Sequence, residues 1–253
     1  MTHDEALFQF LLRMGDNTLI LGNRVSEWCG HSPVLEEDIA LANTALDLIG
    51  QTQFWLGLAG EVEGQGRTAD DLAFHRDAWD FRNLLLVELP NGDFGQTLMR
   101  QFLFDAYQSV LLGRLISSSD ERVAAIAAKA SKEVAYHVER SADTVVGLGD
   151  GTEESHARMQ AALDYLWPYV GEMFTGDEVD AAMADTGIAP DPASLQEDFN
   201  VLISRVMGEA TLSVPNAKYS HKGGRSGVMH TEHLGHLLTS MQWLQRAYPR
   251  AAW

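Results

Sequence analysis

Apolar residues recur every three or four positions along most of this chain, and no segment alternates between apolar and polar residues as a strand would. The first such segment, 5–29, places Leu7, Leu11 and Met14 on one face. The pattern predicts an all-α protein, a compact helical bundle with additional C-terminal helices that forms one domain over residues 1–253. The expected helical segments are 5–29, 33–61, 71–88 as one or two helices, 94–117, 120–149, 152–176, 191–212 and 231–248.

Capping residues give the expected starts of several helices. Ser32, followed by Pro33 and three acidic residues, is typical of a helix start, because a first-turn proline needs no hydrogen-bond partner and acids favour the positive end of a helix. Thr152 and Thr231 are expected to cap the segments that follow them. The Gly-rich polar sequence of 213–229 predicts a long loop before the last helix.

Polar residues interrupt the apolar faces of four expected helices. Asp105 and Gln108 are three residues apart on one face, and Glu133 and His137 are one turn apart on the next helix. Helical bundles that bind two irons place a Glu on each of two helices and a Glu-x-x-His pair on each of the other two. The corresponding positions in this chain are Asp47, Asp105, Gln108, Glu133, His137, Asp164 and Trp167.

This set of residues argues against a working di-iron centre. None of the four helices carries Glu-x-x-His at these positions, Gln108 is a poor iron ligand, and Trp167 is none. The alternative is that the residues are hydrogen-bonded core groups. In that case Asp105 or Glu133 needs a neighbouring donor such as His137, Gln108 or an Arg, because an unpaired buried carboxylate is strongly destabilising. We therefore expect a metal-free core here.

A second candidate site is the histidine-rich segment 230–236. His230, His233 and His236 are spaced by three residues, so a first-row metal with Glu232 as a base is one interpretation. The order is not His-Glu-x-x-His, however, and Thr231 with Glu232 is also typical of a helix start. The sequence favours a structural or interface role for this segment.

Charge and cysteine content exclude several classes of protein. Eighteen basic against 36 acidic side chains give a net charge of −18, which repels nucleic acid. No apolar run reaches the roughly 20 residues of a membrane span, and the N-terminus lacks a basic signal-peptide start. A lone Cys29 forms neither an internal disulfide nor a cysteine-based metal site. We expect a cytoplasmic protein with no membrane partner.

One loop departs from the general acidity. It contains four basic or titratable residues, and one hypothesis is that they approach the phosphates of a ligand or an acidic patch of a partner. These residues are Lys218, His221, Lys222 and Arg225.

Several stretches resemble the PaaC-type subunits of phenylacetyl-CoA epoxidases. They are 27–51 (EWCGHSPVLEEDIALANTALDLIGQ), 81–92 (FRNLLLVELPNG), 132–137 (KEVAYH), and 230–235 (HTEHLG) with 241–246 (MQWLQR). The resemblance covers nearly the whole chain, and the stretches are long and unusual in composition. Where some relatives have Asp-x-x-His, this chain has Asp105-x-x-Gln108.

The resemblance implies a ferritin-like fold and a structural, non-catalytic role. In this family the related PaaA protein holds the di-iron site and binds phenylacetyl-CoA, and a separate reductase with FAD and an iron–sulfur cluster delivers electrons from NADPH. The complex adds one oxygen atom of O₂ across the aromatic ring, giving a ring-1,2-epoxide in aerobic phenylacetate breakdown. The resemblance thus implies no cofactor in this chain, and a hetero-oligomer with PaaA and other epoxidase components, with self-association left open.

Two other functions remain open from the residues alone. One is an autonomous di-metal oxidase that uses Asp47, Asp105, Glu133, His137 and Asp164; the other is a self-assembling storage or stress bundle. For the PaaA-binding function, partner contacts are expected on the first two long helices, in the turn 27–35 and around 230–236. The candidate contact residues are Glu27, Trp28, His31, Lys222, Arg225, His230, Glu232, His233 and His236.

Overall fold

The computed structural model describes residues 1–216, 219–249 and 251, and these residues form α-helices and short 3-10 helices without any strand. The chain gathers into two compact units, one comprising Met1–Pro90 with the segment from Lys222 onward and the other Asn91–His221. The predicted all-α class is therefore confirmed, and each unit is described by itself. None of the described helices is long and apolar enough to cross a membrane.

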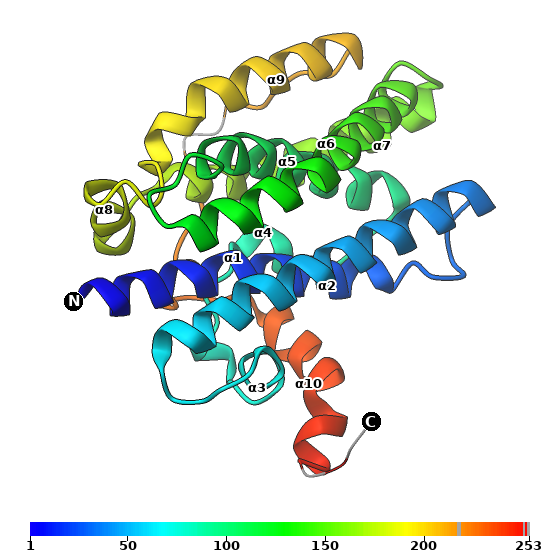
Figure 1. Ribbon diagram of the computed structural model, residues 1–253. Coiled ribbons are helices and arrows are strands. Elements are labelled where there is room, and N and C mark those ends of the chain that lie inside the picture. Colours follow the sequence, from blue (N-terminus) through cyan, green and yellow to red (C-terminus); the bar gives the residue numbers. More distant parts are fainter. Residues whose placement is uncertain (217–218, 250, 252–253) are drawn as a thin grey trace. The chain divides into compact units, whose positions relative to one another are not determined.

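The first unit is built on a pair of long helices, α1 and α2, joined by a short connection (Figure 1). They run antiparallel, since Thr18 lies opposite Thr52, with 2.8 Å between the two hydroxyl oxygens. Gly15 lets the helices approach closely, because a Cβ there would lie 2.5 Å from Leu56. The helices of this unit are α1 (His3–Ser26), α2 (Leu35–Glu63), α3 (Ala69–Phe74), the 3-10 helix η1 (Ala78–Asp80), α4 (Leu85–Glu88) and α10 (Glu232–Ala247).

A buried ion pair fixes the irregular segment that follows α2. Arg76 donates to both carboxylate oxygens of Asp16, at 3.0 Å for Nη1 and with a shorter contact for Nη2, and both side chains are almost fully buried. The Arg82 backbone N–H also donates to Asp16, at 2.8 Å. Gln242 and Arg246 of α10 donate to the Arg76 carbonyl, at 3.1 and 2.6 Å. This network attaches α10 to α1 by way of residues 76–82.

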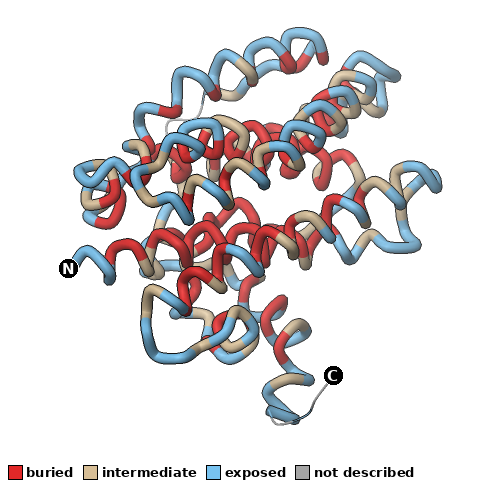
Figure 2. Tube along the Cα trace, in the orientation of Figure 1, coloured by how far each residue is buried: buried red, intermediate tan, exposed pale blue. Residues whose placement is uncertain are grey.

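The second unit is built on α5 and α6, which are joined by a five-residue connection and packed along one another. An aromatic cluster connects α5 with residues later in the unit: Phe174 packs 6.0 Å from Tyr107 of α5 and 5.0 Å from Phe199, measured between ring centroids. Buried positions follow the inner faces of these helices and exposed positions their outer faces (Figure 2). The unit contains α5 (Phe94–Leu115), α6 (Glu121–Gly149), α7 (Glu153–Leu166), the 3-10 helix η2 (Trp167–Phe174), α8 (Glu178–Asp185), the 3-10 helix η3 (Pro192–Leu195) and α9 (Gln196–Glu209).

Several predicted boundaries were wrong for local reasons. The helix expected from Ser32 and Pro33 begins only at Leu35, because the preceding turn folds back onto Asp38, whose carboxylate accepts the Gly30 N–H at 2.8 Å. The helix expected to reach residue 176 changes to a 3-10 helix at Trp167, beside Pro168, which has no N–H to continue the α-helical pattern.

Two other segments also differ from the prediction. Residues 71–88 form three short helices instead of one or two, since their backbone follows the Asp16 network and the packing of the leucines in α4. The helix expected from Asp191 begins as the 3-10 helix η3. Helix α8 was missed by the sequence pattern, which offered too few turns to show a helical period. The cap at Thr152 is confirmed, because its side chain accepts the Ser155 N–H at 3.1 Å.

The glycines of α2 yield a test of packing. A Cβ at Gly60 would lie 2.1 Å from the Arg67 carbonyl oxygen, whereas one at Gly57 would meet no atom within 4 Å. We expect Gly60→Ala to lower the free energy of unfolding by about 1–3 kcal/mol through overpacking. Gly57→Ala should raise it by up to about 1 kcal/mol, the helix-propensity gain. Urea unfolding of both variants checks this, and equal effects would contradict the described packing.

Candidate functional site

The middle of α5 carries a fully buried carboxylate at Asp105. Its Oδ1 accepts a hydrogen bond from Gln101 Nε2 at 2.7 Å, and its Oδ2 accepts one from Ser141 Oγ of α6 at 3.0 Å. The expectation that a neighbouring donor satisfies this carboxylate is confirmed. Gln101 lies one turn before Asp105 on α5, and Ser141 lies on the neighbouring α6; the sequence pattern did not single out either donor.

Burial has a marked effect on the ionisation of this group. It raises the pKa of Asp105 to about 6, while the charge of nearby His137 and the hydrogen bonds from Gln101 and Ser141 lower it. The carboxylate is therefore stabilised by its neighbours, but less than water would stabilise it. A perturbed acid inside a bundle is a frequent sign of a functional site, although core networks also produce one.

Within the second unit, the other described positions of the di-iron pattern do not form a group of metal ligands around Asp105. In the second unit Gln108 and His137 are buried, Glu133 is half-buried and Trp167 is half-buried at the start of η2. Asp164 is exposed on α7 and accepts a hydrogen bond from Gln160 at 2.9 Å. The remaining position, Asp47, is half-buried on α2 of the first unit. Asp164 therefore does not point into the core of this unit.

These residues do not fit a di-iron centre. A carboxylate-bridged pair of irons needs several inward carboxylates, and here Asp164 faces solvent while an amide and an indole replace two further ligands. In the described part of the chain, no group of three or more His, Cys, Asp and Glu side chains is arranged to hold a metal ion. A true Glu-x-x-His pair does occur elsewhere, at Glu153 and His156, but His156 Nδ1 bonds to the Gly149 carbonyl at 2.7 Å at the start of α7.

The largest polar constellation of the first unit is centred on Glu88, which the sequence pattern did not reveal. This side chain is fully buried at the end of α4, in a run of leucines. Its Oε1 accepts from Asn83 Nδ2 at 2.9 Å and from His230 Nδ1 at 2.6 Å. Its Oε2 accepts from both the backbone N–H and the hydroxyl of Thr231, each at 2.7 Å. We call Asn83, Glu88, His230 and Thr231 the Glu88 node.

The Glu88 node explains how α10 begins. Thr231 is the N-cap residue, as predicted, yet its hydroxyl donates to Glu88 instead of accepting a hydrogen bond from its own helix. The carboxylate also lies at the positive end of α10, which favours negative charge. Arg24 of α1 donates to the Glu88 carbonyl at 2.8 Å. The node thus connects α1, α4 and α10 within the first unit.

The histidine-rich segment does not converge into one site. His230 is held in the Glu88 node with its side chain 5% exposed, whereas His236 and Glu232 are exposed and His233 is half-buried along α10. The spacing of three residues therefore distributes these side chains between a buried contact and the surface. The structural role that the sequence favoured agrees with this placement for His230.

The basic loop is also divided. Lys218 lies outside the described residues, and His221 stacks on Tyr169 in the second unit with 4.4 Å between ring centroids. In the first unit Lys222 is exposed, but Arg225 is buried and its carbonyl accepts a hydrogen bond from Arg13 at 3.1 Å. Arg225 is buried because the Gly-rich loop packs tightly against residues 82–85: a Cβ at Gly224 would lie 2.4 Å from the Asn83 carbonyl oxygen. Its predicted role as a contact residue for a partner stays a prediction.

The three remaining candidates lie together after the end of α1. Glu27 is exposed and pairs with Arg24 at 3.3 Å, Trp28 is half-buried, and His31 is exposed. The Asp38 carboxylate fixes this turn by accepting the N–H groups of Gly30 and Ser32, at 2.8 and 3.4 Å. The turn therefore presents a defined surface beside the start of α2.

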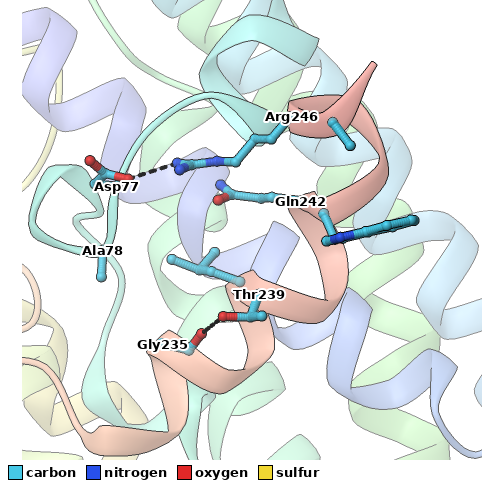
Figure 3. Close-up of a pocket in the computed structure, with 9 residues that line it drawn as sticks. Asp77, Ala78, Gly235, Thr239, Gln242 and Arg246 are labelled. Atoms are coloured by element: carbon cyan, nitrogen blue, oxygen red, sulfur yellow. Dashed lines mark hydrogen bonds and ion pairs between the residues drawn. The ribbon is translucent and has the colours of Figure 1, made fainter. Parts of the chain in front are cut away.

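A groove of about 470 Å³ lies alongside α10 (Figure 3). Its polar side chains are already engaged: Arg246 donates to Asp77 at 2.9 Å, and Gln242 donates to the Ala73 carbonyl at 2.9 Å. Thr239 donates to the Gly235 carbonyl at 2.8 Å. Ligand sites usually combine apolar walls with a few convergent polar groups, and this groove shows no such convergence among the described residues.

Comparison with known proteins gives a consistent family assignment. The whole chain, residues 1–253, matches the family described as phenylacetic acid catabolic protein. It is also 47% identical over 247 residues to a protein of Escherichia coli (strain K12) that is named as one of the subunits of 1,2-phenylacetyl-CoA epoxidase. That alignment covers 98% of this chain and 99% of the relative.

The raised pKa of Asp105 predicts how stability depends on pH. An unfolded Asp titrates near pH 3.9, so the folded protein holds this proton to a higher pH, and ionisation opposes folding by about 3 kcal/mol when complete. The contribution of Asp105 to stability should therefore decrease as pH rises from about 4 to about 6. We expect Asp105→Asn to be more stable than the wild type at pH 7 and similar to it at pH 4.

Urea unfolding at several pH values between 4 and 7 measures this difference. Asp164→Asn is the matched control, because the exposed Asp164 should give no such difference. If Asp105→Asn were less stable than the wild type at pH 7, the conclusion that the ionised Asp105 carboxylate destabilises the folded protein would be wrong.

The Glu88 node yields a second prediction. In Glu88→Gln an amide NH₂ replaces one acceptor oxygen and faces donors from Asn83, His230 or Thr231. We expect the free energy of unfolding to fall by about 1–3 kcal/mol, the cost of leaving buried donors unsatisfied. Hydrogen exchange should show earlier opening of α10 than in the wild type. The exposed neighbour Glu232→Gln is the control, and equal protection of α10 in both variants would refute the role of the node.

Proposed function

We propose that this chain, which belongs to the phenylacetic acid catabolic protein family, is a structural subunit of a 1,2-phenylacetyl-CoA epoxidase. In this proposal it takes part in phenylacetate catabolism and binds the PaaA catalytic subunit, which holds the di-iron site. The epoxidation and its electron supply through a flavin and iron–sulfur reductase belong to the other components. The chain itself works without a cofactor, in the cytoplasm.

The observation that carries the proposal is the mismatch between a helical framework and its metal-ligand positions. The second unit keeps a buried carboxylate on α5 opposite a buried histidine on α6, but these groups lie in a hydrogen-bonded core with Gln101 and Ser141. At the position where an inward ligand is required on α7, Asp164 faces solvent. Hydrogen bonds between core side chains account for this set of residues, which supports a role other than oxygen activation.

The similarity to a protein named as an epoxidase subunit supports the same division of labour. A subunit without its own reaction centre contributes by holding a partner in a defined arrangement, which requires rigid helices with accessible faces. The Glu88 node and the Asp16–Arg76 ion pair supply that rigidity in the first unit, because they link α10 to α1 through buried charges. We infer that this unit presents a fixed helical surface to PaaA.

Two measurements test this function. Metal analysis of the purified chain should show far fewer than the roughly two irons per chain of a di-iron oxidase. The second is an epoxidase assay with PaaA and the reductase, in which activity should require this chain and stay unchanged in Asp105→Asn. An autonomous oxidase that uses Asp105 would lose activity in this variant, and activity of PaaA in the absence of the chain would also contradict the proposal.

A further inference from the structure

The outer face of α2 carries a largely apolar stripe. At 100° per residue, Leu35, Ile39, Leu46, Gly50 and Gly57 fall within an arc of about 60°, in which the exposed Gln53 is the polar member. The three large side chains are 69%, 53% and 69% exposed, respectively. The stripe runs from Leu35 to Gly57, a rise of about 33 Å along the helix. Within its unit, α2 packs on α1 and α3 through other positions (Figure 2).

The two glycines of the stripe have no packing role within the chain. A Cβ at Gly50 or Gly57 would meet no atom within 4 Å, in contrast to Gly60 on the same helix. Glycine in a helix interior is less favourable than alanine, so its presence needs a reason. Helices α5, α6, α9 and α10 each hold one such open glycine, but α2 holds two, seven residues apart on one face. This arrangement suits the close approach of another helix.

The charges of α2 indicate what kind of helix that is. Its sequence contains six acidic residues and neither Lys nor Arg. On the helical projection the exposed Glu36 and Glu61 lie along one edge of the stripe. Along the other edge, Asp38 accepts the Gly30 N–H and Glu63 pairs with Arg67, so the first edge is the one that carries acids open to a partner. A second copy of this chain would bring the same acids into contact and carries a net charge of −18. Like charges facing one another across an interface are strongly unfavourable.

We propose that the α2 stripe (Leu35, Ile39, Leu46, Gly50, Gly57) is the docking surface for an amphipathic helix of a partner subunit, one whose apolar face is bordered by Lys and Arg. The partner helix packs its side chains over the two glycines and between the leucines, and its basic borders face the acids of α2. This proposal rests on the proposed function, and it identifies the surface of the chain that binds the catalytic subunit.

The first experiment measures the affinity of the full-length chain for the purified PaaA protein by biolayer interferometry. Leu46→Arg should weaken binding at least tenfold, because it introduces a positive charge that faces the basic borders of the partner helix. The matched control is Val201→Arg on α9, since Val201 is 68% exposed and Leu46 is 69% exposed. This control should bind as the wild type does.

A second variant separates binding from folding. Gly50→Leu has open space in the isolated chain, so its melting temperature should equal or exceed that of the wild type, while its bulk should block a close helix and weaken binding at least tenfold. The control is Gly208→Leu, where a Cβ also meets no atom within 4 Å. The double charge reversal Glu36→Lys with Glu61→Lys should also weaken binding. The loss of affinity relative to the wild type should be larger at low salt than at high salt, because salt screens the repulsion between the charges.

The outcomes distinguish a failure of the proposed α2 surface from a failure of the proposed function. If the wild-type chain does not bind PaaA, the proposed function fails. If the wild type binds and Leu46→Arg and Gly50→Leu bind equally well, the function stands and the α2 surface is refuted. If the two variants instead dissociate a homodimer on sizing and leave PaaA binding unchanged, the occupant is a second copy and the proposal is overturned.

Discussion

The first unit depends on one buried carboxylate. Glu88 lies fully buried among leucines, where an unsatisfied charge would be strongly destabilising, and four donor groups surround its two oxygens. Two of these groups belong to Thr231 and one to His230, so the carboxylate can be satisfied only when the segment preceding α10 is in place. The packing of this unit therefore depends on these hydrogen bonds. The Gly-rich loop before His230 also lies close to the backbone of Asn83, at Gly224.

Asp105 of the second unit is a contrasting case. It is equally buried but accepts its hydrogen bonds from Gln101 and Ser141, both neutral groups, and burial raises its pKa to about 6. The amide and the hydroxyl stabilise the carboxylate by hydrogen bonding but do not neutralise its charge, so burial remains the larger effect on its pKa.

The long helices could be predicted from the sequence because their apolar spacing extends over many turns, as in α1, α2, α5 and α6. The Glu88 node could not, because a single Glu in a leucine-rich stretch has no period and its partners lie 142 and 143 residues away. The histidine-rich segment 230–236 was a candidate from its spacing, but the sequence did not indicate that its first residues contact Glu88, as the structure shows. Similarly, the spacing of the candidate residues along the chain predicted where Asp164 lies on its helix. It could not predict that the side chain is exposed, because exposure depends on how α7 packs.

The position of Glu88 also constrains the order in which the chain can fold. The chain leaves the first unit at Pro90, just after Glu88, and returns at Lys222, shortly before His230. A ribosome therefore completes all of the second unit before it produces His230 and Thr231, which supply three of the four donor groups of Glu88. The second unit has its full sequence first and can form early, whereas in α1 to α4 Glu88 has only Asn83 among these donors until the C-terminal segment emerges. Newly made first units are thus the stage at which this protein is most exposed to misassembly.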